Sequence, residues 1–371
     1  ILAAAGAGME LTPECLLDEP IAAFIDFAVR EPQLAEATAR GAREVVVFDF
    51  GGGTCDVAVL SISRKPDGTL TVANRAVSRY FRLGGGDIDR AIVHEVLLPA
   101  LLAENPEFGD EPLTYEDKKL ILEPTFLSDA EALKVGLCLE LNRKLGHGVA
   151  HDELLLTKKS LASTRQVHLR GRTLKLTRPT LTAQQFEVLL EPFLDPDVLA
   201  QEDGEYVTRC SIFAPIKGAL RQAGLDATKA TDCIIVGGSA LIPQVAAAVR
   251  GYLPRAAMYA ARDYDVVKNC VSRGAAYYAL ALQISGKSPV TAIASDAVYI
   301  THASGHVQLL AAGQELPFPA GRHFESCDKL GFPKDCNDRT VKLRIELSNA
   351  ARGRILYSGV VELPGPVRKG E

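Results

Sequence analysis

The chain has 371 residues, which at roughly 150 residues per domain is enough for two or three domains. Hydrophobic residues make up 47% and charged residues 23%, a balance typical of folded globular proteins and not of disordered or collagen-like chains. There are 41 lysines and arginines against 46 aspartates and glutamates, so the net charge is −5, which argues against a general nucleic-acid or membrane-surface binder.

The apolar runs, the N-terminal sequence and the cysteines indicate the cellular compartment of the protein. The longest apolar run, residues 275–284, is half of the roughly 20 residues that span a bilayer, and it predicts a buried helix. The chain begins without a methionine or the basic segment of a signal peptide, so we expect a fragment of a cytoplasmic protein. Four of the eight cysteines lie in apolar strings, where free thiols pack as small hydrophobes: Cys55, Cys138, Cys233 and Cys270.

Three consecutive strands are predicted in the first part of the chain. The run at 45–48 is continuously apolar, as in a strand buried on both faces, and it leads into a glycine-rich loop at 49–54. Pro20 suits the first turn of a preceding helix. In order, we expect a helix within 16–30, strands at 45–48, 55–63 and 69–77, and a turn at 66–68 between the last two.

Helices dominate the middle of the chain, and strands return at its end. Asp87 is the expected cap of a helix at 88–102, Ser128 the cap of a helix at 128–141, and Thr182 with Gln185 forms a capping box. The remaining predictions are short strands over 154–176, helices at 207–223, 243–252 and 274–283, a strand at 232–236, an interdomain linker at 284–289, and strands at 340–347 and 354–363.

Glycine-rich turns adjoin predicted strands at three places: 49–54, 84–87 and 237–239. Glycine lets backbone N–H groups approach phosphate oxygens, and a carboxylate such as Asp49 at a strand end suits hydrated Mg²⁺. Each turn alone is compatible with an ordinary tight turn, but three of them favour a ligand site. Neither a Walker A motif nor a G-x-G-x-x-G motif follows a strand, which excludes P-loop NTPases and Rossmann dehydrogenases by motif.

Four segments carry a resemblance to the DnaK-type, seventy-kilodalton heat-shock chaperones. Residues 46–57 (VVFDFGGGTCDV) resemble the second phosphate motif, and 83–90 (LGGGDIDR) resemble the next signature, with Gly86 in place of an acidic residue. Residues 234–243 (IIVGGSALIP) are similar to the adenosine motif, and 19–23 (EPIAA) to the connecting helix that carries a catalytic glutamate. The resemblance implies an α/β actin-like ATPase (ribonuclease H-like) fold. It also implies a chaperone that couples ATP binding and hydrolysis to binding of unfolded apolar peptides.

The resemblance also assigns domains. It implies a nucleotide-binding domain at 1–285, with 1–40 as a remnant of the first lobe and 41–285 as the second lobe, and a partial, sandwich-like peptide-binding β domain at 286–371. Residues 307–317 (VQLLAAGQELP) are similar to the start of that β domain. The resemblance implies co-chaperones as partners, and we expect neither a nucleic acid nor a membrane as a partner.

The resemblance implies a site for ATP or ADP with magnesium. Asp49 would hold Mg²⁺ through water, Glu19 would position the attacking water, and Thr54 would act at the γ-phosphate. The implied nucleotide contacts are Gly51, Gly52, Gly53 and Thr54 at the phosphates, Gly84 and Gly85 beside phosphates and ribose, Glu131 and Lys134 at the ribose and adenine, and Gly237, Gly238, Ser239 and Ile242 around the adenosine. Without the resemblance, Glu131 and Lys134 read as a solvated surface ion pair.

Several positions depart from the family pattern. Leu241 and Val135 stand where arginine is usual, and Lys268 replaces an aspartate. The family's first phosphate loop, Asp-x-Gly-Thr-Thr, has no counterpart, so we expect the N-terminal part of the nucleotide-binding domain to be lacking and ATP hydrolysis to be slow. A nucleotide-sensing pseudo-ATPase scaffold of the same fold is the alternative, and a sugar or acetate kinase is a weaker one because such enzymes need no β domain after the adenosine motif.

Overall fold

The fold is taken from a computed structural model. It describes residues 17–31, 33, 36, 41–64, 70–78, 81–108, 112–198, 201–203, 206–209, 211–260, 264–286, 290–291, 297–302, 305–311, 314, 335–338, 340–349 and 354–369. The predicted turn at 66–68 lies outside these residues, as do parts of the predicted linker at 284–289 and of the segment at 307–317. Within the described part, no helix combines the length and the apolar character needed to cross a membrane.

A six-stranded mixed sheet forms the centre of the molecule, in the order β11-β10-β1-β2-β3-β12. β1 runs parallel to β10 and antiparallel to β2, and β10 runs parallel to β11. The apolar run predicted as a strand lies within β1, and it is buried on both faces as expected. The strands are β1 (Arg43–Phe50), β2 (Cys55–Arg64), β3 (Leu70–Val77), β10 (Asp232–Val236), β11 (Ala257–Ala260) and β12 (Val290–Thr291).

Helices cover both faces of this sheet, and alternation along β1 decides which side chain meets which face. Val45 and Val47 pack with α2 (Glu19–Arg30) and α11 (Tyr264–Ser285). Val46 and Phe48 belong to the other core, with α9 (Phe213–Ala223) and α10 (Pro243–Tyr252). The sheet is therefore a buried middle layer, and its strand ends are its accessible edges.

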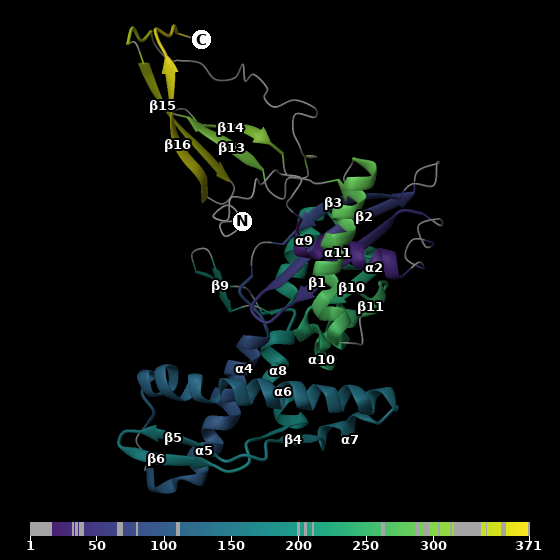
Figure 1. The fold of residues 1–371 in the computed structure, drawn as a ribbon, viewed down its shortest axis with the longest axis vertical. Coiled ribbons are helices and arrows are strands. Elements are labelled where there is room, and N and C mark those ends of the chain that lie inside the picture. The colour runs from purple at the N-terminus through teal and green to yellow at the C-terminus, as the bar shows by residue number, and fades with distance from the viewer. Residues whose placement is uncertain are drawn as a thin grey trace.

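A mainly helical region lies on one side of the sheet and a separate antiparallel sheet on the other (Figure 1). The helical region contains α4 (Gly85–Ile92), a π-helical segment Val93–Leu97, α5 (Leu98–Glu104), a 3₁₀ turn Pro106–Phe108, a π-helical segment Asp117–Leu122, α6 (Glu123–Gly146), α7 (His151–Leu155) and α8 (Ala183–Leu194). Short two-stranded sheets accompany it: β4 (Lys158–Ser160) with β7 (Thr180–Thr182), and β5 (Arg165–Leu169) with β6 (Arg172–Leu176).

The C-terminal sheet has four strands in the order β14-β13-β15-β16. All of its described pairings are antiparallel. Its two long strands confirm those predicted at 340–347 and 354–363. The bounds are β13 (Val298–His302), β14 (Gly305–Leu310), β15 (Thr340–Asn349) and β16 (Arg354–Pro364); the remaining elements are β8 (Gln201–Asp203), β9 (Tyr206–Arg209) and 3₁₀ turns at Ala227–Lys229 and Gly238–Leu241.

Several predicted helix boundaries were wrong. Asp87 is the third residue of α4 and not its cap, because the helix starts at Gly85. Ser128 lies inside α6, which begins at Glu123. The helix predicted at 207–223 begins only at Phe213, after the strand β9, although Gly224 ends it as predicted, with a left-handed φ of 67°. The helix predicted at 274–283 extends over Tyr264–Ser285.

The apolar run 275–284 is also less buried than predicted. Leu280 is 51% exposed and Ile284 is 77% exposed, whereas Tyr278 is 9% exposed. The run lies in α11, whose other face packs on α2 and the sheet. Continuous apolarity therefore did not mean burial all around this helix.

The capping box at the start of α8 forms as predicted. The Thr182 hydroxyl accepts a hydrogen bond from the Gln185 N–H at 3.2 Å, and the Gln185 side chain accepts one from the Thr182 N–H at 3.1 Å. We expect Thr182→Ala to lower the free energy of unfolding by about 1 kcal/mol, because the Gln185 N–H in the first turn loses the hydroxyl that accepts its hydrogen bond. Urea denaturation measures this, with Ser163→Ala in an exposed bend as the control. Equal stability of both variants would contradict the prediction.

Candidate functional site

The candidate site begins at the carboxyl ends of the parallel strands β1 and β10. Asp49 pairs in register with Val236 of β10 on one side and with Asp56 of β2 on the other. Gly237 follows Val236 directly, so the loop after β10 starts beside the Asp49 carboxylate. Ligands of open α/β sheets bind at such edges, where loops from neighbouring strands meet. This register brings the first and third glycine turns together.

The three predicted glycine turns contact one another through hydrogen bonds. The Gly85 N–H donates to the carbonyl oxygen of Gly51 at 3.0 Å, and the Gly86 N–H donates to that of Gly52 at 2.8 Å. The Ser239 hydroxyl also donates to the Gly51 carbonyl, at 2.8 Å. The loops after β1, before α4 and after β10 therefore form one continuous surface.

Three glycines allow these turns to approach closely. A Cβ atom on Gly237 would lie 2.3 Å from the carbonyl oxygen of Phe50 and 2.6 Å from Oδ1 of Asp49, and its φ of +89° is itself unfavourable for other residues. A Cβ on Gly84 would lie 2.4 Å from the Gly53 nitrogen, and one on Gly85 would lie 2.3 Å from the Ser239 hydroxyl oxygen. These glycines are needed for contacts within the protein.

The other glycines of the turns are open. A Cβ on Gly52, Gly53 or Gly238 would meet no heavy atom within 4 Å, and all three residues are exposed. Their backbone groups are thus accessible from outside, as a ligand with phosphate oxygens requires. The site therefore has a tightly packed inner layer of glycines and an accessible outer one.

The Asp49 carboxylate is buried and lies among other carboxylates. Burial, with the carboxylates of Glu19 and Asp56, raises the pKa of Asp49 from 3.8 to about 7. Burial also raises the pKa of Asp56, although a hydrogen bond from Thr54 opposes the rise. Asp49 is 8% exposed, while Glu19 at the start of α2 is exposed. A cation at this edge would relieve the repulsion between these groups.

Among the described residues, no group of three or more histidines, cysteines, aspartates or glutamates is arranged to hold a metal ion directly. Magnesium commonly keeps several waters and binds proteins through one or two carboxylates plus substrate phosphates. A buried carboxylate with a raised pKa, next to open backbone N–H groups, fits that requirement. The chemistry of Asp49 is therefore compatible with the water-mediated magnesium contact that the resemblance implies.

The predicted adenosine side is built from α6 and the loop after β10. Ile242 and Ser239 are buried, and the Asn142 side-chain amide donates to the carbonyl oxygen of Leu241 at 2.8 Å, which ties α6 to that loop. Val135 is 47% exposed on the same helix. At the two usual arginine positions, this loop and this helix therefore carry the apolar side chains of Leu241 and Val135 instead of guanidinium groups.

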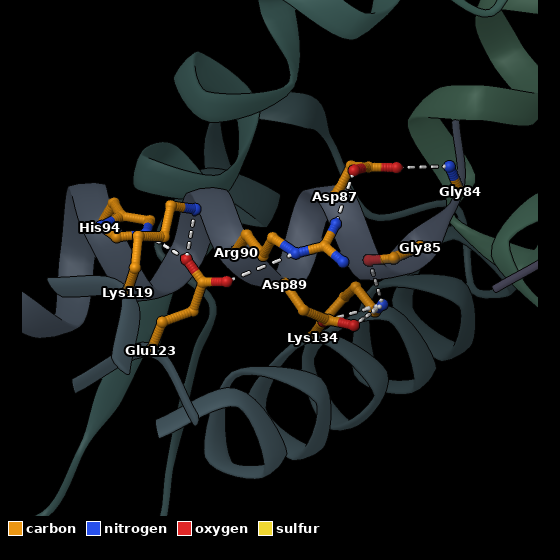
Figure 2. Close-up of polar contacts among 9 residues, drawn as sticks. All are labelled: Gly84, Gly85, Asp87, Asp89, Arg90, His94, Lys119, Glu123 and Lys134. Carbon is orange, nitrogen blue, oxygen red and sulfur yellow. Dashed lines mark hydrogen bonds and ion pairs between the residues drawn. The ribbon is translucent and has the colours of Figure 1, made fainter. Parts of the chain in front are cut away.

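Glu131 and Lys134 lie in different environments. Glu131 is exposed, whereas the Lys134 side chain is 8% exposed. The Lys134 ammonium lies 2.8 Å from Oδ1 of Asp89, donates to Oδ2 at 2.9 Å, and donates to the carbonyl oxygen of Gly85 at 3.0 Å (Figure 2). The prediction from the sequence alone, a surface ion pair between Glu131 and Lys134, is therefore wrong, because Lys134 is buried and pairs with Asp89.

Comparison with known proteins identifies relatives among bacterial chaperones. The chain is 29% identical over 248 residues to "Chaperone protein DnaK" of Thermus thermophilus, covering 67% of this chain and 32% of the relative. It is 27% identical over 249 residues to "Chaperone protein dnaK3" of Synechocystis sp. and, again at 27%, to "Chaperone protein dnaK3" of Synechococcus elongatus, covering 67% of this chain and 25% and 26% of those relatives. Residues 2–101 match the family model described as Hsp70 protein.

The chain is thus similar to the Hsp70 family, whose model matches its first part and whose DnaK members match two thirds of it. The matched region spans between a quarter and a third of the length of these curated relatives. The similarity implies an actin-like ATPase fold, and the mixed sheet with helices on both faces agrees with it. The Hsp70 family match includes the first two glycine turns, and the third lies in contact with them.

Two acidic residues of the candidate site were missed at the sequence level. Asp56 stands inside the second phosphate motif, and its register opposite Asp49 across an antiparallel pair was the available signal. Asp89 follows Asp87 by two residues, so on a helix it points to another side, toward α6. No spacing rule connects Asp89 with Lys134, which is 45 residues away.

Proposed function

We propose that this Hsp70-like chain is the nucleotide-binding and partial peptide-binding portion of an ATP-dependent chaperone that acts in the cytoplasm. The observation that carries the proposal is the convergence of three glycine turns beside the buried carboxylate of Asp49. Open backbone at Gly52, Gly53 and Gly238 can receive phosphate and sugar groups there, because no Cβ blocks the approach. ATP and ADP with magnesium are the proposed ligands.

The proposed roles follow the order of the turns along the bound nucleotide. Asp49 holds magnesium through water, Glu19 and Asp49 orient the attacking water, and Thr54 contacts the γ-phosphate. Around them, Gly51, Gly52 and Gly53 take the phosphates, Gly84 and Gly85 lie beside phosphates and ribose, Glu131 reaches the ribose, and Gly237, Gly238, Ser239 and Ile242 border the adenosine. Bound magnesium would supply positive charge that offsets the phosphate oxygens during transfer.

The domain division is part of the proposal. We assign 1–285 to the nucleotide-binding domain, with 1–40 in the first lobe and 41–285 in the second, and 286–371 to a β-sandwich-like peptide-binding domain. The antiparallel sheet of β13 to β16 supports the latter, because an extended apolar peptide can add backbone hydrogen bonds to such a sheet and seat its side chains in adjacent pockets. Unfolded peptides and co-chaperones are the proposed partners.

Gly238→Asp tests the proposed nucleotide site. The added side chain meets no protein atom, so the fold should persist, but its negative charge stands where the nucleotide would lie. We expect calorimetric titration of the full chain with Mg·ADP and Mg·ATP to detect binding for the unsubstituted protein and none for Gly238→Asp or Asp49→Ala. Each loss should be about a hundredfold or more, the change that about 2.7 kcal/mol produces.

The matched control places the same charge elsewhere. Ala247→Asp adds a carboxylate on the exposed face of α10 and should leave the affinity unchanged. Absence of binding by the unsubstituted chain, or unchanged affinity of Gly238→Asp, would reject the site.

The pseudo-ATPase scaffold is the second candidate, favoured by Leu241 and Lys268, which stand where the family usually has an arginine and an aspartate. A fluorescent, extended leucine-rich peptide separates the two. A chaperone's affinity for the peptide changes when Mg·ATP is added, whereas a nucleotide-sensing scaffold binds nucleotide without that change.

A further inference from the structure

The glycine turn at the start of α4 is held by two separate charged pairs (Figure 2). At Gly84, the backbone N–H donates to Oδ2 of Asp87 at 2.8 Å, and Arg90 donates to Oδ1 of the same carboxylate at 2.7 Å. At Gly85, the carbonyl oxygen accepts from Lys134, which Asp89 neutralises. We call these two charged pairs, Asp87 with Arg90 and Asp89 with Lys134, the anchors of the turn. Their residues lie on α4 and α6, and none lies in the loops after β1 and β10.

The two anchors differ in exposure. Arg90 is 39% exposed and shares a second carboxylate, Glu123, whose oxygen lies 3.5 Å away and which also pairs with His94 and Lys119. Lys134 and Asp89 are each 8% exposed in their side chains. Burial raises the pKa of Asp89, and the Lys134 ammonium is the largest opposing influence. An ion pair in this environment is sensitive to geometry, since either partner alone would be an uncompensated buried charge.

Gly85 is fixed on both of its sides. Its N–H donates to the Gly51 carbonyl in the phosphate turn, and its carbonyl accepts from Lys134. A Cβ at Gly85 would lie 3.0 Å from the Lys134 nitrogen and 2.3 Å from the Ser239 oxygen, so the ammonium and the loop after β10 meet at this one residue. Moving Lys134 would release the point at which all three turns are joined.

We propose that Lys134 is a positioning residue of the nucleotide site, which acts by holding Gly85 and, through Gly85, the three glycine turns. The inference rests on the proposed function in taking the ligand to be a nucleotide, but the contacts of Lys134 do not depend on that function. The ammonium is buried, its charge is neutralised by Asp89, and it points at a backbone carbonyl of the turn. Glu131, exposed three residues earlier on α6, remains available to the ribose.

Backbone amide hydrogen exchange, followed residue by residue by NMR on the full chain without nucleotide, tests the positioning role directly. Lys134→Met alone leaves Asp89 charged and buried, so the principal variant is the pair Lys134→Met with Asp89→Leu, which removes both charges and keeps apolar volume. We expect the protection of the Gly85 and Gly86 amides to fall by about tenfold or more, the effect of a loss of about 1.4 kcal/mol. Amides of β1 and β10 should keep their protection.

Lys158→Met, an exposed lysine of β4, is the matched control and should change neither group of amides. Unchanged protection of Gly85 and Gly86 in the paired variant would overturn the proposal. A uniform fall across the whole sheet would also overturn it, because it would assign the ion pair to general stability instead of to the turn.

Affinity for analogues separates positioning from direct contact. If Lys134 positions the turn, the paired variant loses affinity for Mg·ADP and also for magnesium-bound 2′-deoxy and 3′-deoxy ADP. A lysine that acted only as a ribose ligand would instead lower the affinity for ADP and spare the deoxy analogue that lacks its hydroxyl, which would overturn the proposal. If the unsubstituted chain binds none of them, the proposed function fails, while the exchange experiment still decides the role of Lys134.

Discussion

Gly274→Ala is expected to lower the free energy of unfolding by about 3 kcal/mol, at the upper end of what overpacking an interior costs. Gly274 lies in α11, where that helix crosses α2. A Cβ at this position would lie 1.7 Å from the carbonyl oxygen and 2.5 Å from the carbonyl carbon of Ala22. Both atoms are backbone of α2, so no side-chain rotation can relieve the contact and the two helices must separate.

Separating these helices also strains an ion pair beside the contact. Arg273 donates two hydrogen bonds to the buried carboxylate of Asp26, both at 2.9 Å, and a third to the carbonyl oxygen of Val266 at 3.0 Å. Asp26 is 0% exposed, so loss of the guanidinium would leave it without its main compensation. We therefore expect Gly274→Ala to cost more stability than a steric overlap with one atom alone would.

Urea denaturation measures the change, with Gly218→Ala as the matched control. Gly218 lies within α9, and a Cβ there meets no atom within 4 Å. Alanine should raise the free energy of unfolding there by about 0.5–1 kcal/mol, since it has the higher helix propensity. Two variants of equal stability would show that α2 and α11 do not pack as described.

Helices and strands were predicted well from the sequence where a pattern of neighbouring residues was enough to define them. The apolar run in β1 and the Thr182 capping box both needed only neighbouring residues, and both formed. Helix starts were less predictable where the cap has no side-chain signal. Gly84 caps α4 through its backbone, and α6 continues directly from a π-helical segment, so neither start has a preceding serine, threonine or aspartate at the cap.

The candidate site divides in the same way. Strand ends predicted that the glycine turns would lie near one another, because parallel strands share an edge. The sequence could not distinguish glycines that pack against backbone, such as Gly237, from open ones such as Gly238, since the difference lies in contacts across the fold. The partner of Lys134 was unpredictable for the same reason, because Asp89 comes from another helix.

Asp49→Asn is expected to stabilise the nucleotide-free protein above pH 7. The pKa of Asp49 is about 7 in the folded chain against an ordinary 3.8, so the folded state holds this proton more tightly than the unfolded state does. The stability that Asp49 contributes is therefore fully present below about pH 4 and is lost as the pH rises through about 7. With the carboxylate ionised, the cost is on the order of 4 kcal/mol, which the neutral amide does not incur.

Free energies of unfolding at pH 5, 6, 7 and 8 for both proteins test this, because their difference isolates Asp49 from groups that titrate in both. The difference should be smallest at pH 5, should grow in favour of Asp49→Asn up to about pH 7 and should level off by pH 8, while Asp152→Asn on the exposed α7 stays parallel to the unsubstituted chain. Magnesium without nucleotide should narrow the gap at pH 8 by stabilising only the protein that retains the carboxylate. A difference independent of pH would mean that Asp49 titrates as an ordinary exposed aspartate, and the electrostatic reason for a cation at this edge would fall with it.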